Sequence, residues 1–189
     1  MPALAGINMK PIESAKSKLN EIIEYITNPK LKEICCFVIN NPLFRESTGS
    51  LQSHQAYSGG LLVHTAEVLN IAINISATPC IKTDLNVLIT ACIFHDYGKI
   101  WDYKRHPTGF GFEYTEHKHL IRHLSRSYAE FMIMTHNVID EDLRTKIGHC
   151  ILSHHGRKEW GSPIEPISVE AYILHTADNL SANVTIENW

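Results

Sequence analysis

Apolar residues recur at helical spacing along almost the whole chain, whereas runs of alternating β-branched residues are scarce. Near the N-terminus, for example, Ile12, Leu19, Ile22 and Ile26 are separated by seven, three and four positions. The same spacing predicts helices over 12–27, 30–40, 61–76, 84–96, 117–136, 140–154 and 168–184. We therefore expect an all-α fold, built as a helical bundle.

Residues that begin or end helices support these boundaries. A proline disfavours helical backbone in the residue before it, so Asn28-Pro29 separates the first two helices. Asp84 and Ser168 are candidate N-caps. Gly98 suits a left-handed position that ends the helix begun at Asp84.

Two stretches interrupt the helical pattern. Residues 42–60 are rich in Pro, Gly and Ser, which predicts turns. Residues 100–115 carry aromatic side chains on both sides of a His-Pro-Thr-Gly sequence, which predicts a small hairpin or lid.

Composition and charge narrow the class of protein. A chain of 189 residues, 44% of them hydrophobic, can bury one sizeable core. A formal net charge of -3 supplies no global attraction for polyanions, which argues against long duplexes as substrates. The five cysteines include no CxxC pair and favour reduced thiols, and no apolar run approaches the roughly 20 residues of a membrane span. We expect a cytoplasmic protein that does not enter a membrane.

Histidine and aspartate recur in a set that can hold metal ions. The candidate ligands are His64, His95, Asp96, His123, His154, His155 and Asp178. Each lies on or at the end of a predicted helix, and bundles commonly build metal sites from side chains that project inward. Imidazole binds Mn, Fe, Ni, Co and Zn, and a carboxylate can bridge two cations. Because the set contains no thiol, it favours a catalytic site over a structural zinc site. We expect two divalent metal ions, Mn or Fe, with Ni, Co, Zn and Mg as alternatives.

Lys99 adds a positive charge beside this set. It follows Asp96 by three residues, and Gly98 lets the backbone turn between them. An ammonium group there can reach the oxygens of a phosphate resting on the metals. A bound cation lowers the pKa of its water to about 7, which generates a nucleophile. Asp96 and Lys99 are therefore the candidate catalytic residues for phosphoester hydrolysis.

These motifs resemble the HD-domain superfamily of metal-dependent phosphohydrolases, whose pattern is His, His-Asp, sometimes further His positions, and then Asp. The resemblance is closest to the HD domain of bacterial 3′-to-5′ exoribonucleases that join an oligonucleotide-binding OB domain to an HD domain. The segments that carry it are SHQAYSGGLLVHT (53–65), IFHDYGK (93–99), YTEHKHLIRH (114–123), ILSHHGRKEWGSP (151–163) and EAYILHTADNLSA (170–182).

The resemblance implies a metal assignment and a domain organisation. One metal would be bound by His64, His95, Asp96 and Asp178, and the second by Asp96, His123, His154 and His155. The chain would be a single HD domain over 1–189, with an N-terminal helical cap over 1–50 and the metal-binding HD core over 51–185.

Two features differ from that family. The family usually has small residues before the position of His123 and in the turn upstream, where this chain has Arg122 and Lys118 or His119. Residues 1–50 are predicted as helix rather than as the five strands of an OB domain. An HD domain of this size fits a nucleotide, a short single-stranded nucleic acid, or a substrate that a protein partner supplies.

Several residues are weaker candidates. His119 competes with His123 for the metal position, since the two lie four residues apart on one helix face. Candidate substrate contacts are His54, Lys99, Arg157, Trp160 and His175, among which Trp160 can stack on a base.

The leading hypothesis is a phosphodiesterase or nuclease that acts on short nucleic acid or nucleotides through a dinuclear site. A mononuclear nucleotidase, which is a phosphomonoesterase, would need only the first four ligands. A non-catalytic nucleotide-binding module of a larger assembly is the alternative outside the enzyme class. These alternatives stay open at the level of sequence, as does the oligomeric state.

Overall fold

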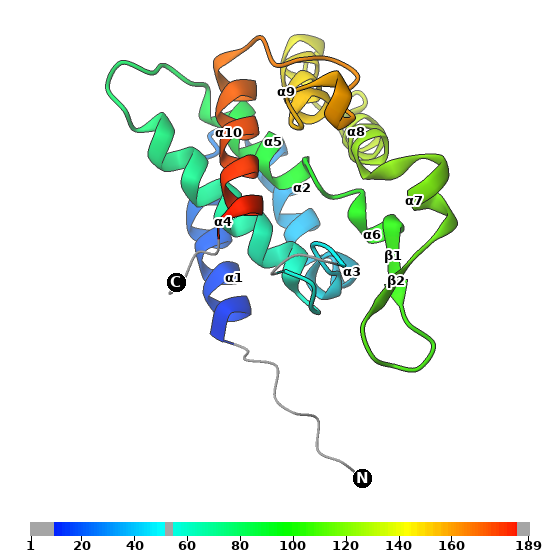
Figure 1. The fold of residues 1–189 in the computed structure, drawn as a ribbon. Helices are drawn as coiled ribbons and strands as arrows, with labels where there is room; N and C mark the ends of the chain where they lie inside the picture. The colour runs from blue at the N-terminus through cyan, green and yellow to red at the C-terminus, as the bar shows by residue number, and fades with distance from the viewer. Residues whose placement is uncertain (1–9, 52–54, 185–189) are drawn as a thin grey trace.

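A computed structural model describes residues 10–51 and 55–184 (Figure 1). Its α-helices are α1 (Lys10–Ile23), α2 (Pro29–Asn40), α3 (Pro42–Glu46), α4 (Gly60–Ser76), α5 (Leu85–Phe94), α6 (Lys99–Asp102), α7 (Glu116–Leu120), α8 (Arg122–Thr135), α9 (Glu141–Ser153) and α10 (Val169–Asn183). A short 3₁₀ helix, η1 (Lys158–Trp160), precedes α10, and the strands are β1 (Tyr103–Arg105) and β2 (Phe112–Tyr114). The predicted all-α class is confirmed.

Helix α5 lies at the centre of the bundle. Every residue from 87 to 94 is buried, because α2, α4, α8, α9 and α10 all contact this helix. Helices α1 and α10 both pack along α4 (Figure 1). A helix that is apolar all round belongs in such a core, and its C-terminal end therefore opens into the interior of the protein.

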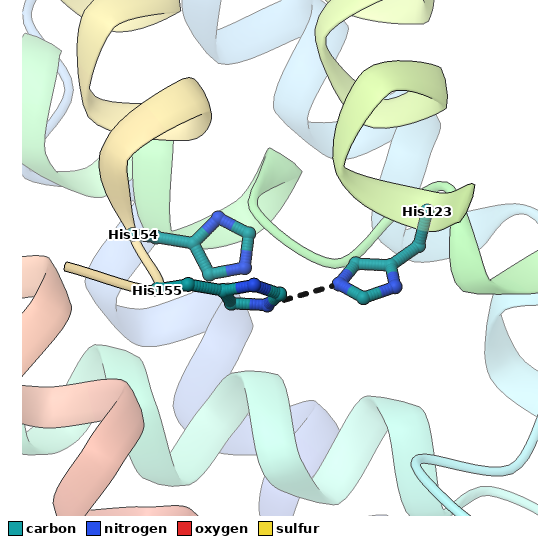
Figure 2. A group of neighbouring side chains, drawn as sticks. All are labelled: His123, His154 and His155. Atoms are coloured by element: carbon teal, nitrogen blue, oxygen red, sulfur yellow. Dashed lines mark hydrogen bonds between the residues drawn. The ribbon is translucent and has the colours of Figure 1, made fainter. Parts of the chain in front are cut away.

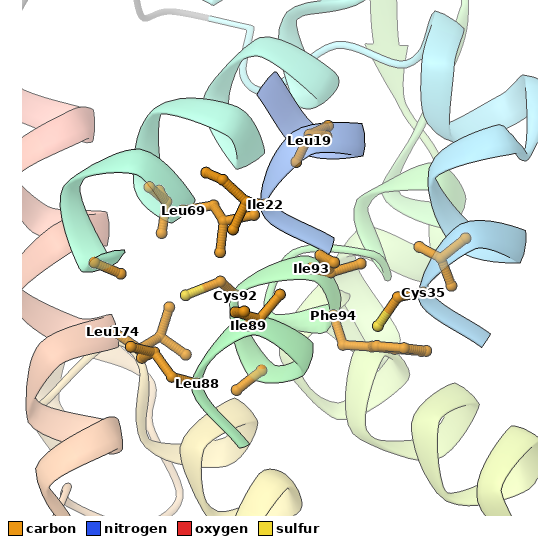
Figure 3. Close-up of a cluster of buried hydrophobic side chains, with 14 of the residues drawn as sticks. Leu19, Ile22, Cys35, Leu69, Leu88, Ile89, Cys92, Ile93, Phe94 and Leu174 are labelled. Atoms are coloured by element: carbon orange, nitrogen blue, oxygen red, sulfur yellow. The ribbon is translucent and has the colours of Figure 1, made fainter. Parts of the chain in front are cut away.

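The hydrophobic core is continuous from the N-terminal helices to α10. Leu19 of α1 and Cys35 of α2 belong to the same buried cluster as Leu69, Ile89 and Leu174 (Figure 3). The division into a cap over 1–50 and a core over 51–185 stays a prediction. None of the described helices has both the length and the apolar character that crossing a membrane requires.

The predicted caps hold the ends of the helices that carry the site. Asp84 accepts a hydrogen bond from the Asn86 N–H at 2.9 Å, and Ser168 accepts one from Ala171 at 3.2 Å. These bonds satisfy N–H groups that the first turn of a helix leaves free. Both candidate N-caps are confirmed.

Two helix boundaries near the N-terminus differ from the prediction. The first helix ends at Ile23 rather than at residue 27, because Thr27 and Asn28 donate their N–H groups to the side chain of Asn86 on α5. The stretch 42–60, predicted as turns, begins with the short helix α3, which Asn41 caps and which buries Phe44.

Gly98 has a different role from the one that the sequence suggested. Its backbone is right-handed, with φ -61°, so the predicted left-handed position is wrong. A Cβ at Gly98 would lie 2.2 Å from the carbonyl oxygen of His123, and the Gly98 N–H donates to Ser127 Oγ at 2.8 Å. The glycine is needed because the turn after α5 lies directly against α8.

The helix predicted over 117–136 is two helices. Ile121 separates α7 from α8, and Arg122, the first residue of α8, has a left-handed backbone with φ 68°. The His123 N–H that follows donates to the Asp102 carboxylate at 3.1 Å. A contact across 21 residues therefore starts a new helix within an apolar pattern that is locally continuous.

The hairpin predicted near 100–115 is confirmed. Strands β1 and β2 pair antiparallel, with Tyr103 opposite Tyr114 and Arg105 opposite Phe112. The hairpin projects from the bundle between α6 and α7 (Figure 1). Its action as a lid stays a prediction.

Phe94 offers a test of the core beneath the site. Its ring is fully buried and lies edge-on to Phe131, with ring centroids 5.3 Å apart. We expect Phe94→Ala to lower the free energy of unfolding by about 3–5 kcal/mol, since it leaves a cavity. The matched control is Phe37→Ala on α2, where the ring is 62% exposed and the cost should stay within about 0.5 kcal/mol. Urea unfolding followed by circular dichroism measures both, and equal losses would contradict this account of the core.

Candidate metal centre

The structure brings all seven predicted ligands together. His64 lies on α4, His95 and Asp96 follow the end of α5, and Asp178 lies on α10. Their donor atoms form one group in which all lie within 4.8 Å of one another. The second group, at the same spacing, consists of His123, His154 and His155.

The second group joins two helix ends. His154 and His155 directly follow α9, and His123 lies in the first turn of α8. Figure 2 shows the rings pointing toward one another, and the Nε2 atoms of His123 and His155 are 3.2 Å apart. Three imidazoles that converge in this way, with no acidic residue among them, are typical of a metal site.

Asp96 lies between the two groups. Its Oδ2 atom is 3.3 Å from His64 Nε2 and 3.4 Å from His95 Nε2. Its Oδ1 atom is 3.4 Å from His123 Nε2 and 3.9 Å from His154 Nε2. One oxygen thus faces each group, which is the geometry in which a carboxylate bridges two cations.

Carbonyl groups at helix ends orient two of the histidines. His95 Nδ1 donates to the carbonyl of Cys92, and His154 Nδ1 donates to that of Ile151, each at 2.7 Å. A proton held on Nδ1 leaves the lone pair of Nε2 directed into the site, which is the form that binds a metal. His154 Nε2 is fully buried and has no hydrogen-bond partner among the described atoms. Burying a polar atom unpaired is costly, so the residues present fit a bound cation.

A buried polar chain orients His64. Gln55 Nε2 donates to Glu67 Oε2 at 2.7 Å, and Ser181 Oγ donates to the same oxygen at 2.8 Å. Since the single hydroxyl proton of Ser181 is used there, its oxygen accepts from His64 Nδ1 at 3.0 Å. His64 Nε2 is again left to face the site.

Asp102 is a residue of the site that sequence reasoning missed. It is fully buried at the end of α6, and its Oδ2 atom lies 3.3 Å from His123 Nδ1 in addition to accepting the His123 N–H. Its Oδ1 atom contacts His117 Nδ1 at 2.8 Å, and Lys118 balances its charge at 3.4 Å. No local spacing signals this role, because Asp102 and His123 are separated by a hairpin and a helix.

Electrostatics keep the two carboxylates ionised. Burial alone would raise the pKa of Asp96, but the charges of Lys99 and His95 hold that pKa well below its usual range. Burial would likewise raise the pKa of Asp178, yet the hydrogen bond from His64 keeps it low. Ionised carboxylates are the form that coordinates a metal.

The histidines divide into two kinds. Burial lowers the pKa of His154 well below its usual value, and burial with the nearby His123 lowers the pKa of His155 to about 4. Both are therefore neutral at physiological pH, which is the form of imidazole that can bind a metal. Burial would lower the pKa of His64 too, but the hydrogen bonds to Asp178 and Asp96 raise it to about 9. A cation bound between these carboxylates would displace that proton.

Lys99 lies where the sequence suggested, against Asp96. Its Nζ atom is 2.6 Å from Asp96 Oδ2. Burial would lower the pKa of Lys99, but the Asp96 charge raises it, so the ammonium is retained. The positive charge beside the predicted metal ligands is therefore stable in the folded protein.

The weaker candidate residues differ in where they lie relative to the cluster. His119 is exposed on α7, with its ring against Tyr114, so His123 and not His119 joins the cluster. His54 lies outside the described residues. Trp160 and His175 line a pocket of about 440 Å³ whose inner wall includes Asp178.

Arg157 lies against the ring of Trp160, one of the residues that line that pocket. Its guanidinium lies 5.0 Å from the ring centre of Trp160, and the rings of Trp160 and His175 are 6.1 Å apart. The Trp160 carbonyl accepts from His155 Nδ1 at 3.1 Å, which connects this loop to the second ligand group. An aromatic, hydrogen-bonding pocket thus opens beside the cluster.

The fold and the cluster together define a helical domain whose His and Asp groups can hold divalent metal ions. The model of the HD domain family matches residues 61–183, and the chain belongs to that family. The family implies divalent metal binding, in agreement with the two His and Asp groups.

Two curated relatives share one name. The 3′-5′ exoribonuclease YhaM of Bacillus subtilis strain 168 is 32% identical over 186 residues, covering 93% of this chain and 58% of the relative. The protein of that name from Shouchella clausii is 32% identical over 174 residues, covering 89% and 53%. This chain thus spans little more than half the length of the curated relatives it matches. No solved structure matches it.

Asp102 can be tested as a positioning residue for His123. Asp102→Asn keeps the shape of the side chain but removes the charge that orients the ring, and outer hydrogen bonds of this kind contribute about 10–100-fold to metal affinity. We expect the variant to bind one of two Mn²⁺ ions about 10–100-fold more weakly, as measured by equilibrium dialysis and elemental analysis.

The matched control is Glu113→Gln, which neutralises a carboxylate of the neighbouring hairpin that pairs with Lys104. It should bind metal as the unaltered protein does. Equal affinities for Asp102→Asn and the unaltered protein would show that Asp102 does not act on the site.

Proposed function

We propose that the protein is a phosphodiesterase of the nuclease type that uses two divalent metal ions, Mn or Fe, on short single-stranded nucleic acid or nucleotides. The observation that carries this is the position of Asp96, which directs one oxygen toward His64 and His95 and the other toward His123 and His154. Two cations held on such a carboxylate can stabilise both the attacking and the leaving oxygen of a phosphodiester.

The bound metals would supply a hydroxide nucleophile and neutralise charge on the phosphate. In this proposal His64, His95, Asp96 and Asp178 hold the first ion, and Asp96, His123, His154 and His155 the second. The buried hydrogen bonds that Nδ1 of His64, His95 and His154 donates keep these side chains from reorienting, so their Nε2 atoms are in place before a substrate arrives.

Lys99 would change its interaction partner when a metal ion binds. Without a cation its ammonium group neutralises Asp96 Oδ2 at 2.6 Å. Lys99 would lose this partner if the first group held a cation, and its ammonium group would then be able to approach a phosphoryl oxygen. Lys99 then offsets the negative charge that develops on the phosphate.

The Trp160 loop supports a nucleic-acid substrate. Trp160 is 53% exposed beside the ligand cluster, and Asn179 adds an amide to the same pocket. Stacking a base on an aromatic side chain contributes about 1–3 kcal/mol. The relatives are named as 3′-5′ exoribonucleases, which agrees with a nucleotide in this position.

A mononuclear nucleotidase is the competing enzyme. It would need only the first group, and the convergence of His123, His154 and His155 would then have no role. The buried, unpartnered Nε2 of His154 therefore favours the dinuclear phosphodiesterase.

The proposed activity predicts a substrate preference. With Mn²⁺ added, we expect hydrolysis of bis-p-nitrophenyl phosphate and of short RNA or DNA, and slower hydrolysis of p-nitrophenyl phosphate. Asp96→Asn, which removes the charge of the bridging carboxylate, should reduce the rate at least about 100-fold. A preference for the monoester would instead support the nucleotidase. Inactivity on every substrate, with no metal found by elemental analysis, would support a binding module.

The second metal has its own test. We expect His123→Ala to retain one Mn²⁺ per chain instead of two and to lose diester hydrolysis, because the second group then keeps only two imidazoles. The matched control is His119→Ala, four residues earlier on α7, where the exposed ring faces Tyr114. This control should keep two metals and full activity. Undiminished diester hydrolysis by a His123→Ala protein with one metal would exclude the dinuclear mechanism.

A further inference from the structure

Arg122 holds a backbone conformation that is costly for its side chain. Its φ of 68° is left-handed, a conformation that residues other than glycine adopt only at an energetic cost. Arg122 directly precedes His123, so the strained residue belongs to the same turn as a candidate metal ligand. Backbone strain of this kind occurs often at binding sites.

The Arg122 side chain lines a second pocket beside the ligand cluster. This pocket measures about 460 Å³, and its wall includes Lys118, Arg122, His123 and His155. Arg122 Nη1 lies 3.8 Å from the position that a Cβ of Gly161 would take, so the side chain extends from α8 toward the loop after α9. The guanidinium therefore lies on the path to the second ligand group.

The other cations near this pocket already have partners. Lys118 Nζ pairs with Asp102 at 3.4 Å, and its charge also lies over the ring of Tyr114 at 5.8 Å. Arg126 pairs with Glu130 at 2.8 Å. Within residues 10–51 and 55–184, no acidic side chain forms an ion pair with Arg122. The pocket thus holds a guanidinium that is free to bind an anion.

We propose that Arg122 binds a phosphate of the nucleic-acid chain next to the one that is hydrolysed. This inference rests on the proposed function, because it takes the ligand cluster as the position of the scissile phosphate. The planar guanidinium can donate two parallel hydrogen bonds to phosphate oxygens, which an ammonium cannot.

The two pockets define a path along which a nucleic-acid strand could cross the site. The Trp160 pocket and the Arg122 pocket share a single lining residue, His155. A strand that passes over His155 therefore places a base against Trp160 in one pocket and a phosphate against Arg122 in the other. Substrates with one phosphate would not reach Arg122, whereas those with two or more would.

Arg122→Gln tests this assignment. Glutamine keeps a Cβ and a polar side chain, so the backbone strain is retained while the charge is lost. We expect the ratio of kcat/KM for a trinucleotide to kcat/KM for bis-p-nitrophenyl phosphate to fall about tenfold, mainly through a higher KM for the trinucleotide. The slope of log affinity against log salt concentration should decrease by about 0.7 for a single strand. Arg122→Lys should recover the salt slope but only part of the affinity.

The control is Lys82→Gln, which removes a positive charge near the N-terminal end of α5, distant from the ligand cluster. It should leave both the ratio and the salt slope as they are in the unaltered protein. Arg122→Gln with a ratio and slope equal to those of the unaltered protein would overturn the assignment.

Binding separates this inference from the proposed activity. Fluorescence anisotropy of a labelled trinucleotide in the presence of Ca²⁺ measures affinity whether or not the protein hydrolyses it. If the unaltered protein is inactive on every phosphodiester, the proposed function fails, while a tenfold weaker affinity of Arg122→Gln still supports the phosphate contact. Equal affinities would reject the contact even in an active enzyme.

Discussion

The Asp96 carboxylate is the constraint on which the rest of the site depends. It is buried at the end of a helix that is itself surrounded by other helices, and it stays ionised because Lys99 supplies positive charge beside it and His64 forms a hydrogen bond with it. A buried charge is tolerated only when it is compensated. The same arrangement favours cation binding at Asp96, since each of its oxygens faces imidazole nitrogens. Gly98 then lets the turn that carries Asp96 approach α8 closely enough for His123 to join it.

Helix termini provide much of the order in this site. The last carbonyl groups of a helix have no partner within the helix. In α5 and α9 the residue that ends the helix is a histidine, and its Nδ1 bonds the carbonyl three residues earlier, at Cys92 and Ile151. One hydrogen bond thus satisfies the helix end, sets the tautomer and aims Nε2 at the cluster. Stability and metal binding are linked here, because loosening either helix end would also release a ligand.

Two segments outside the hydrophobic core line the pockets beside the candidate metal site. The Trp160 loop and the turn at Arg122 line two pockets that share His155, and each is attached to the second ligand group by a direct contact or by adjacency in the chain. The hairpin β1–β2 stands next to them and follows the short helix that supplies Asp102. Substrate preference can therefore change through these segments while the ligands on the buried helices stay in place.

Most helices, and the histidines and aspartates that come together in the candidate site, could be predicted from the sequence, because helical spacing, N-caps such as Asp84 and Ser168, and the chemistry of imidazole and carboxylate are local properties. Contacts between distant segments decided the rest. The apolar pattern would continue the helix through Arg122, but the helix breaks there because the His123 N–H donates a hydrogen bond to the Asp102 carboxylate. As a result His123, and not His119, lies in the site. Gly98 is required by the closeness of α8 and not by its own dihedral angles. Asp102 and the Gln55–Glu67–Ser181 chain carry no sequence signal, since their partners become neighbours only after the bundle has formed. Local preference thus determined which elements form and which groups can bind metal, and long-range packing determined which of those groups meet.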